Sequence, residues 1–184
     1  MLFIAHRINT VEELKSTPTN FGVEIDIRDR GERLILQHDP YKDGVDFEFW
    51  LESYNHKLLI CNIKSEGVEY RVIELLKRKG IVDYFFLDSS LPMIMKLNKL
   101  GETKIAIRYS EVEPRELAMK FIGKCDWLWV DCFSHYPEID DELKMYFKVC
   151  LVGPTLQLHD WKIEEEWKSY CAVCDKKYKY ENWI

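Results

Sequence analysis

Short apolar runs recur along this chain, and segments with the apolar spacing of a helix separate most of them. Several runs are continuous in Val, Ile, Leu, Phe and Cys, which is typical of strands covered on both faces. The predicted strands are Leu2–His6, Val23–Arg28, Leu58–Ile63, Tyr84–Asp88, Lys104–Arg108, Trp127–Asp131, Lys148–Val152 and Tyr170–Cys174. Strands that alternate with helices indicate a parallel sheet.

The segments between the strands carry charged faces and helix-end signals. Thr10-Val11-Glu12-Glu13 has the pattern of a capping box that opens a short first helix. The turn Asp29-Arg30-Gly31-Glu32 followed by Arg33–Gln37 predicts a β-hairpin where a helix would otherwise begin. The other predicted helices are Gly67–Lys79, Leu91–Leu100, Pro114–Ile122, Glu138–Phe147 and His159–Lys168.

Eight strand–helix units predict an α/β fold in the form of a compact (β/α)8 barrel with a small hairpin after its second strand. A chain of 184 residues suits a single domain over residues 1–184. It is shorter than the ~250 residues usual for this barrel, so its loops and helices must be trimmed. A doubly wound open sheet is the alternative. His6-Arg7-Ile8-Asn9 after the first strand is not the glycine-rich loop that such a sheet uses for nucleotides.

Composition excludes several classes of function. A net charge of −6 argues against binding nucleic acid through bulk charge. No apolar stretch approaches the ~20 residues that span a bilayer, so we expect no stable membrane insertion, and the cytoplasm is the expected compartment. Cysteines in apolar runs fit a reducing compartment, and we interpret Cys171-x-x-Cys174 as core packing, since i and i+3 on a strand face opposite sides.

Titratable residues gather in two runs near the start of the chain. His6 ends the first predicted strand, and His38 follows the predicted hairpin. Glu24 and Asp26 stand at i and i+2, so on a strand both carboxylates point to one face, opposite Ile25. Two adjacent carboxylates repel each other, and a bound cation commonly offsets that repulsion. Metal-assisted phosphate chemistry requires this arrangement.

His6-Arg7, Glu24-x-Asp26-x-Arg28 and His38-Asp39-Pro40 resemble the glycerophosphodiester phosphodiesterase family, over roughly the first 64 residues. Related phosphatidylinositol-specific phospholipases and sphingomyelinase D-like enzymes share the architecture and the use of two histidines. The resemblance implies a barrel, with His6 and His38 as general acid and base. It further implies Glu24 and Asp26 as metal ligands and Lys64 as a cation beside the phosphate. All-oxygen ligation favours Mg²⁺ or Ca²⁺.

The chain also departs from the family pattern. Ile8-Asn9-Thr10 stands where the family has glycine and then a Pro-Glu-Asn-Thr run, and Asn62 stands where the third metal ligand is usually glutamate. An amide oxygen can bind a hard cation but carries no charge. Arg7 reaches the site only if the first strand ends at His6, because strict alternation turns it away.

Other strand ends supply secondary candidates. Arg108 either grips a phosphate or forms a salt bridge at the rim. Asp39 and Asp131 are candidates to support the catalytic groups by accepting hydrogen bonds, although Asp131 could equally be a structural cap.

These residues support two hypotheses for function. The first is a metal-dependent phosphodiesterase that cleaves a small glycerophosphodiester-like or sugar-phosphodiester substrate, by hydrolysis or by cyclisation. The second is a protein that keeps the site without turnover and binds a phosphorylated ligand, which Asn62 and the missing loop residues favour. One sequence does not determine the substrate's identity or the oligomeric state.

Overall fold

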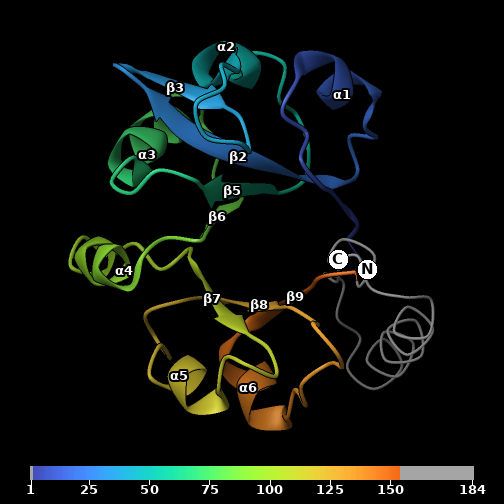
Figure 1. The fold of residues 1–184 in the computed structure, drawn as a ribbon, viewed down its shortest axis with the longest axis vertical. Helices are drawn as coiled ribbons and strands as arrows, with labels where there is room; N and C mark the ends of the chain where they lie inside the picture. The colour runs from blue at the N-terminus through green and yellow to red at the C-terminus, as the bar shows by residue number, and fades with distance from the viewer. Residues whose placement is uncertain (1, 154–184) are drawn as a thin grey trace. The chain divides into compact units, whose positions relative to one another are not determined.

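The computed structural model describes residues 2–153. Its elements belong to two compact units, which we call the N-terminal unit (Ile4–Lys104) and the C-terminal unit (from Ile105 onward, with Phe3). Figure 1 labels most of the elements of both. The predicted strand Tyr170–Cys174, its cysteine pair and the predicted helix His159–Lys168 lie outside the described residues.

A six-stranded sheet with the order β4-β3-β2-β5-β6 forms the centre of the N-terminal unit, and β1 pairs with the first part of β2. β1, β2, β5 and β6 are parallel. β3 runs antiparallel to β2 and forms the hairpin with it, and β4 runs antiparallel to β3. The strands are β1 (Ile4–Ala5), β2 (Gly22–Arg30), β3 (Arg33–Leu36), β4 (Val45–Asp46), β5 (Leu59–Ile63) and β6 (Tyr84–Leu87).

Short helices connect these strands, and local signals set their ends. The expected capping box is present, because Thr10 and Glu13 exchange hydrogen bonds at the start of α1. Pro92 lies in the first turn of α4, where its missing N–H costs nothing. The helices are α1 (Val11–Ser16), α2 (Phe47–Leu51), α3 (Glu69–Arg78) and α4 (Leu91–Asn98). The sequence did not predict α2, which begins at the N-cap Asp46 and buries Phe47 and Trp50 completely.

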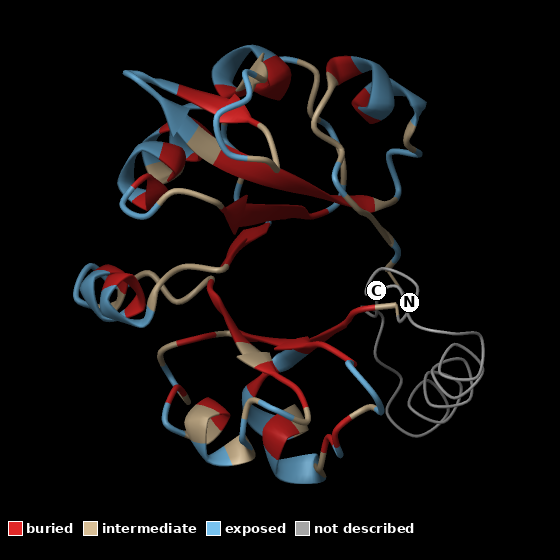
Figure 2. Cartoon of the chain, in the orientation of Figure 1, coloured by how far each residue is buried: buried red, intermediate tan, exposed pale blue. Residues whose placement is uncertain are grey.

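The C-terminal unit contains a three-stranded parallel sheet in the order β7-β8-β9. Its elements are β7 (Ala106–Tyr109), α5 (Arg115–Met119), β8 (Trp127–Val130), α6 (Asp141–Tyr146) and β9 (Lys148–Leu151). Strands are buried along most of their length in both units, as Figure 2 shows in red. Within residues 2–153, no helix is long and apolar enough to cross a membrane.

The prediction of a closed (β/α)8 barrel is wrong. Strands of the described chain fall into two sheets, with β6 at an edge of one and β7 at an edge of the other. A barrel requires an unbroken ring of paired strands. Alternating strands and helices specify parallel crossovers, but they do not specify which strands pair, and the architecture is a mixed α/β fold. The seven strands predicted within the described residues and the hairpin lie close to their expected positions.

Gly44 provides a test of how the loop that carries His38 packs against the end of β3. A Cβ at Gly44 would lie 2.2 Å from the backbone oxygen of Leu36 and 3.0 Å from the Gln37 Cβ. Gly44→Ala should therefore displace backbone and destabilise the protein by about 1–3 kcal/mol in urea unfolding. Gly31→Asn is the matched control. A Cβ there meets nothing within 4 Å, and Asn tolerates positive φ, so its effect should stay within about 0.5 kcal/mol. Equal effects of the two changes would contradict the close approach.

Candidate active site

The polar face of β2 forms the base of the site. β2 and β5 are parallel, and their register sets Asp26 directly beside Asn62. Glu24 lies two residues before Asp26, so the three side chains share one face of the sheet. All three are buried, with 1%, 0% and 7% of their surface exposed for Glu24, Asp26 and Asn62. Glu24 and Asp26 therefore do not form a solvent-exposed face of the strand.

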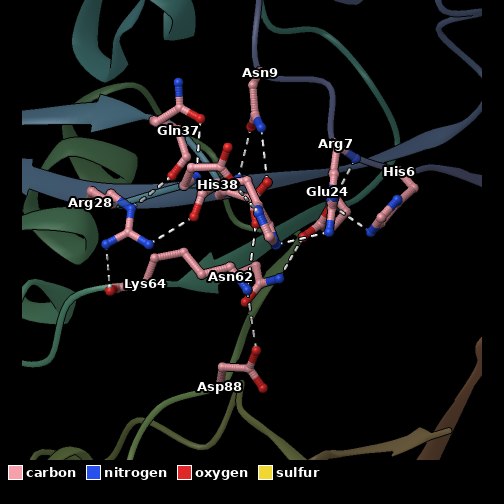
Figure 3. Close-up of polar contacts among 12 residues, drawn as sticks. His6, Arg7, Asn9, Glu24, Arg28, Gln37, His38, Asn62, Lys64 and Asp88 are labelled. Atoms are coloured by element: carbon pink, nitrogen blue, oxygen red, sulfur yellow. Dashed lines mark hydrogen bonds and ion pairs between the residues drawn. The ribbon is translucent and has the colours of Figure 1, made fainter. Parts of the chain in front are cut away.

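The first strand ends early enough to bring Arg7 into the site. β1 stops at Ala5, and Arg7 has a φ of 56°, which turns the chain at the strand end. As a result the Arg7 backbone N–H donates to the Glu24 carboxylate at 2.8 Å. The Arg7 guanidinium reaches His38. Figure 3 shows His6 and Arg7 next to Glu24.

Glu24 is held by donors on both carboxylate oxygens. Oε2 accepts from the Arg7 backbone and Oε1 accepts from Asn62 Nδ2 at 2.8 Å. Burial, and then the neighbouring charge of Asp26, raise the pKa of Glu24 to about 7, against the lowering effect of these hydrogen bonds. Glu24 can therefore hold or release a proton near neutral pH.

Asp26 has a different set of partners. Asn9 forms two hydrogen bonds with it: Asn9 Nδ2 donates to Asp26 Oδ2, and the Asp26 backbone N–H donates to Asn9 Oδ1, both at 2.9 Å. The Lys64 ammonium lies 3.5 Å from Asp26 Oδ1 and 3.5 Å from Asp88 Oδ2. Lys64 thus lies between a fully buried carboxylate and a second one at the end of β6, where Asp88 has a φ of 63°.

His38 is oriented from three directions. Its backbone oxygen accepts from Arg28 Nη2 at 2.7 Å, its Nδ1 lies 2.9 Å from Asp39 Oδ1, and its Nε2 lies 2.8 Å from Arg7 Nη2. A guanidinium has only donors, so Nε2 must be the nitrogen that carries the lone pair. We therefore assign the neutral tautomer in which Nδ1–H donates to Asp39. Lys42 donates to the other Asp39 oxygen at 2.7 Å, and these hydrogen bonds from Lys42 and His38 lower the pKa of Asp39 to about 2.

His6 lies beside Glu24. Its Nε2 is 3.7 Å from Glu24 Oε2, and the side chain keeps 31% of its surface exposed. Burial, and then the charge of Arg7, lower the pKa of His6 from its ordinary value. His6 and Glu24 are therefore adjacent groups whose pKa values are displaced toward each other.

The oxygens of this site fit a hard divalent cation. Asp26 Oδ1 and Asn62 Oδ1 are buried and accept no hydrogen bond. Their residues are neighbours in register on β2 and β5. Buried acceptors of this kind normally have a partner. Carboxylate and amide oxygens are the ligands that Mg²⁺ and Ca²⁺ bind. Among residues 2–153, however, no group of three or more His, Cys, Asp and Glu side chains is arranged to hold a metal, so Asn62 would have to contribute.

The remaining predicted residues lie in the C-terminal unit. Arg108 lies within β7 and forms an ion pair with Asp131, a fully buried residue just after β8. This contact matches the rim salt bridge that was the alternative for Arg108. Arg108 and Asp131 belong to the C-terminal unit, whereas Glu24 and Asp26 belong to the N-terminal unit.

Sequence reasoning missed Asn9. Its role follows from the shortened loop after His6-Arg7, which brings the Asn9 amide back over Asp26. The departure of Ile8-Asn9-Thr10 from the family pattern was the available signal. Asp88 was noted only as a polar strand end, and its link to Asp26 through Lys64 depends on the pairing of β5 with β6.

Comparisons with models of protein families, with curated proteins and with solved structures found no match. The resemblance to glycerophosphodiester phosphodiesterases therefore rests on the short motifs alone.

The pH dependence of stability tests the environment of Glu24. Its pKa in the folded protein is about 7, above the 4.5 of an unperturbed glutamate, so this group's stabilisation is complete below pH 4.5 and is lost as the pH rises through 7. Metal-free wild-type protein should lose on the order of 2–3 kcal/mol relative to Glu24→Gln across that interval. Urea unfolding at pH 5 and pH 8 with a chelator measures the difference. Both proteins keep His6, whose lowered pKa acts in the opposite sense, so parallel profiles would contradict the assignment.

Proposed function

We propose that this protein is a metal-dependent phosphodiesterase that acts on a small glycerophosphodiester-like or sugar-phosphodiester substrate. One observation carries the proposal: both histidines are linked to the buried carboxylate of Glu24. His6 Nε2 lies 3.7 Å from Glu24 Oε2. Arg7 joins Glu24 to His38, because its backbone N–H donates to Glu24 and its guanidinium donates to His38 Nε2 (Figure 3). Cleavage of a phosphodiester needs a base, an acid and positive charge beside the phosphoryl oxygens. The N-terminal unit contains a candidate for each.

In this mechanism His38 is the base and His6 is the acid. His38 Nε2 takes the proton of the attacking hydroxyl while a new P–O bond forms, and Asp39 keeps the imidazole in the required tautomer. The P–O bond to the leaving group breaks, and that oxygen takes a proton from His6. The lowered pKa of His6 makes its protonated form a stronger acid. Attack by water gives hydrolysis, and attack by a neighbouring substrate hydroxyl gives a cyclic phosphate.

The chain's own cations would balance charge on the phosphoryl oxygens, together with a divalent ion if one binds. Lys64 and Arg7 are the candidates to contact phosphate, and Asp26, Asn62 and Glu24 would hold Mg²⁺ or Ca²⁺. An ion bound there would supply positive charge beside the phosphoryl oxygens. Lys64 lies 3.5 Å from Asp26 Oδ1, so its ammonium and a divalent ion would compete for that oxygen.

The contacts of Asn62 support a second candidate function, a protein that binds a phosphorylated ligand without turnover. Asn62 stands at the position where the family has a third acidic ligand. Its amide donates to Glu24 Oε1, so this oxygen already has a hydrogen-bond donor within the protein. A carboxylate that already accepts hydrogen bonds from the protein gains less stabilisation from a bound metal ion.

We further propose the cytoplasm as the compartment and a small-molecule phosphodiester as the binding partner. Cys61 and Cys125 are buried thiols, and burial raises the pKa of the Cys125 thiol to about 12, which suits reduced structural cysteines.

His38→Ala tests the mechanism directly. Loss of a general base lowers turnover by about 100- to 10,000-fold, and we expect this range with bis(p-nitrophenyl) phosphate and glycerophosphocholine, with Mg²⁺ or Ca²⁺ present. His135→Ala, which removes a histidine from an exposed loop of the C-terminal unit, is the control and should keep wild-type turnover. Wild-type rates in His38→Ala, or equal losses in both variants, would refute the assignment of His38.

Asn62→Glu separates the two candidate functions. A third carboxylate should raise the affinity for Mg²⁺ or Ca²⁺ by about tenfold or more, which isothermal titration calorimetry measures. Activity that rises with affinity identifies a weakened enzyme, and affinity that rises alone favours the binding protein. Asn55→Glu adds the same charge at an exposed position before β5 and should change neither quantity. Unchanged affinity in Asn62→Glu would show that this oxygen cluster is not the metal site.

A further inference from the structure

We propose that Arg7 covers the proton-accepting nitrogen of His38 in the ligand-free protein and that a phosphate group uncovers it by drawing the guanidinium away. This inference rests on the proposed function, because it concerns the same base. It adds a step to that function: the base becomes available only when an oxyanion occupies the site.

The His38 ring is held in place without help from Arg7. Arg28 fixes the His38 backbone oxygen, and Asp39 accepts from Nδ1–H. Asp39 is itself fixed by Lys42. If Arg7 moves away, these contacts keep the ring in its orientation with the Nε2 lone pair in the same direction.

Arg7 is anchored at its backbone and exposed at its side chain. The backbone N–H is bound to Glu24 Oε2, and the positive φ fixes the direction in which the side chain leaves the chain. The only hydrogen bond from the guanidinium among the described contacts goes from Nη2 to His38 Nε2, at 2.8 Å. The head group can therefore leave His38 by side-chain rotation while the backbone stays in place.

A phosphate is a better partner for a guanidinium than a neutral imidazole is. An imidazole nitrogen offers one lone pair and no charge, whereas a phosphate accepts two parallel hydrogen bonds that opposite charge strengthens. While Arg7 donates to Nε2, that nitrogen cannot accept the proton of a nucleophile, and a guanidinium cannot accept it instead. Binding of the phosphate therefore frees His38 Nε2 next to the phosphorus atom that the nucleophile attacks.

The experiment follows the ¹⁵N resonance of His38 Nε2 in histidine-labelled protein, with inorganic phosphate alone as the probe. Arg7→Met defines the uncovered state, and Arg7→Gln gives a second uncovered variant in case the first folds poorly. Arg30→Met removes an exposed arginine elsewhere and controls for lost positive charge. We expect the wild-type and Arg30→Met resonances to coincide and the Arg7 variants to differ from them. Phosphate should move the wild-type resonance saturably toward the Arg7→Met position.

Three results would overturn the inference. One is a wild-type resonance that equals that of the Arg7 variants before phosphate is added. The second is phosphate binding, detected by calorimetry, that leaves the resonance unmoved, and the third is no phosphate binding at all. The proposed function fails separately: turnover unaffected by His38→Ala refutes it whatever the resonance does, and a phosphate-driven shift in a protein without turnover leaves Arg7 as the cap of a binding site.

Discussion

Burial of two carboxylates on one face of β2 is the constraint on which the rest of the N-terminal unit depends. Glu24 and Asp26 are almost without contact to solvent, and two adjacent buried charges are tolerated only with donors, cations or a proton nearby. The chain supplies all three. Backbone and amide donors contact Glu24, Lys64 lies beside Asp26, and a raised pKa allows Glu24 to hold a proton near neutral pH.

The hairpin of β2 and β3 also positions His38. The Gln37 backbone N–H donates to the Asp26 backbone oxygen, so the returning strand ends beside the acidic pair and His38 follows at once. Arg28 then donates to the backbone oxygens of Gln37, His38 and Lys64. One arginine side chain thus joins the hairpin to the end of β5 and holds the His38 backbone at that position.

The division of the sheet also limits the resemblance to glycerophosphodiester phosphodiesterases. All the motifs that carry it lie within Ile4–Lys104, and they meet there around β2 and β5. Two of the secondary candidates, Arg108 and Asp131, belong to the C-terminal unit, where they form an ion pair. The resemblance therefore applies to a local site on a sheet, and the chemistry proposed for it requires no closed barrel.

The sequence by itself determined the local features. The shared face of Glu24 and Asp26 follows from the two-residue period of a strand, the Thr10 capping box from local hydrogen bonds, and the hairpin from its turn residues. Only the tertiary structure decided which strands pair, and hence that Asn62 lies beside Asp26, that Asn9 returns over it and that the strands form two sheets. The reason is that strand pairing and side-chain contacts depend on residues far apart in the chain, and no local pattern of one sequence specifies them.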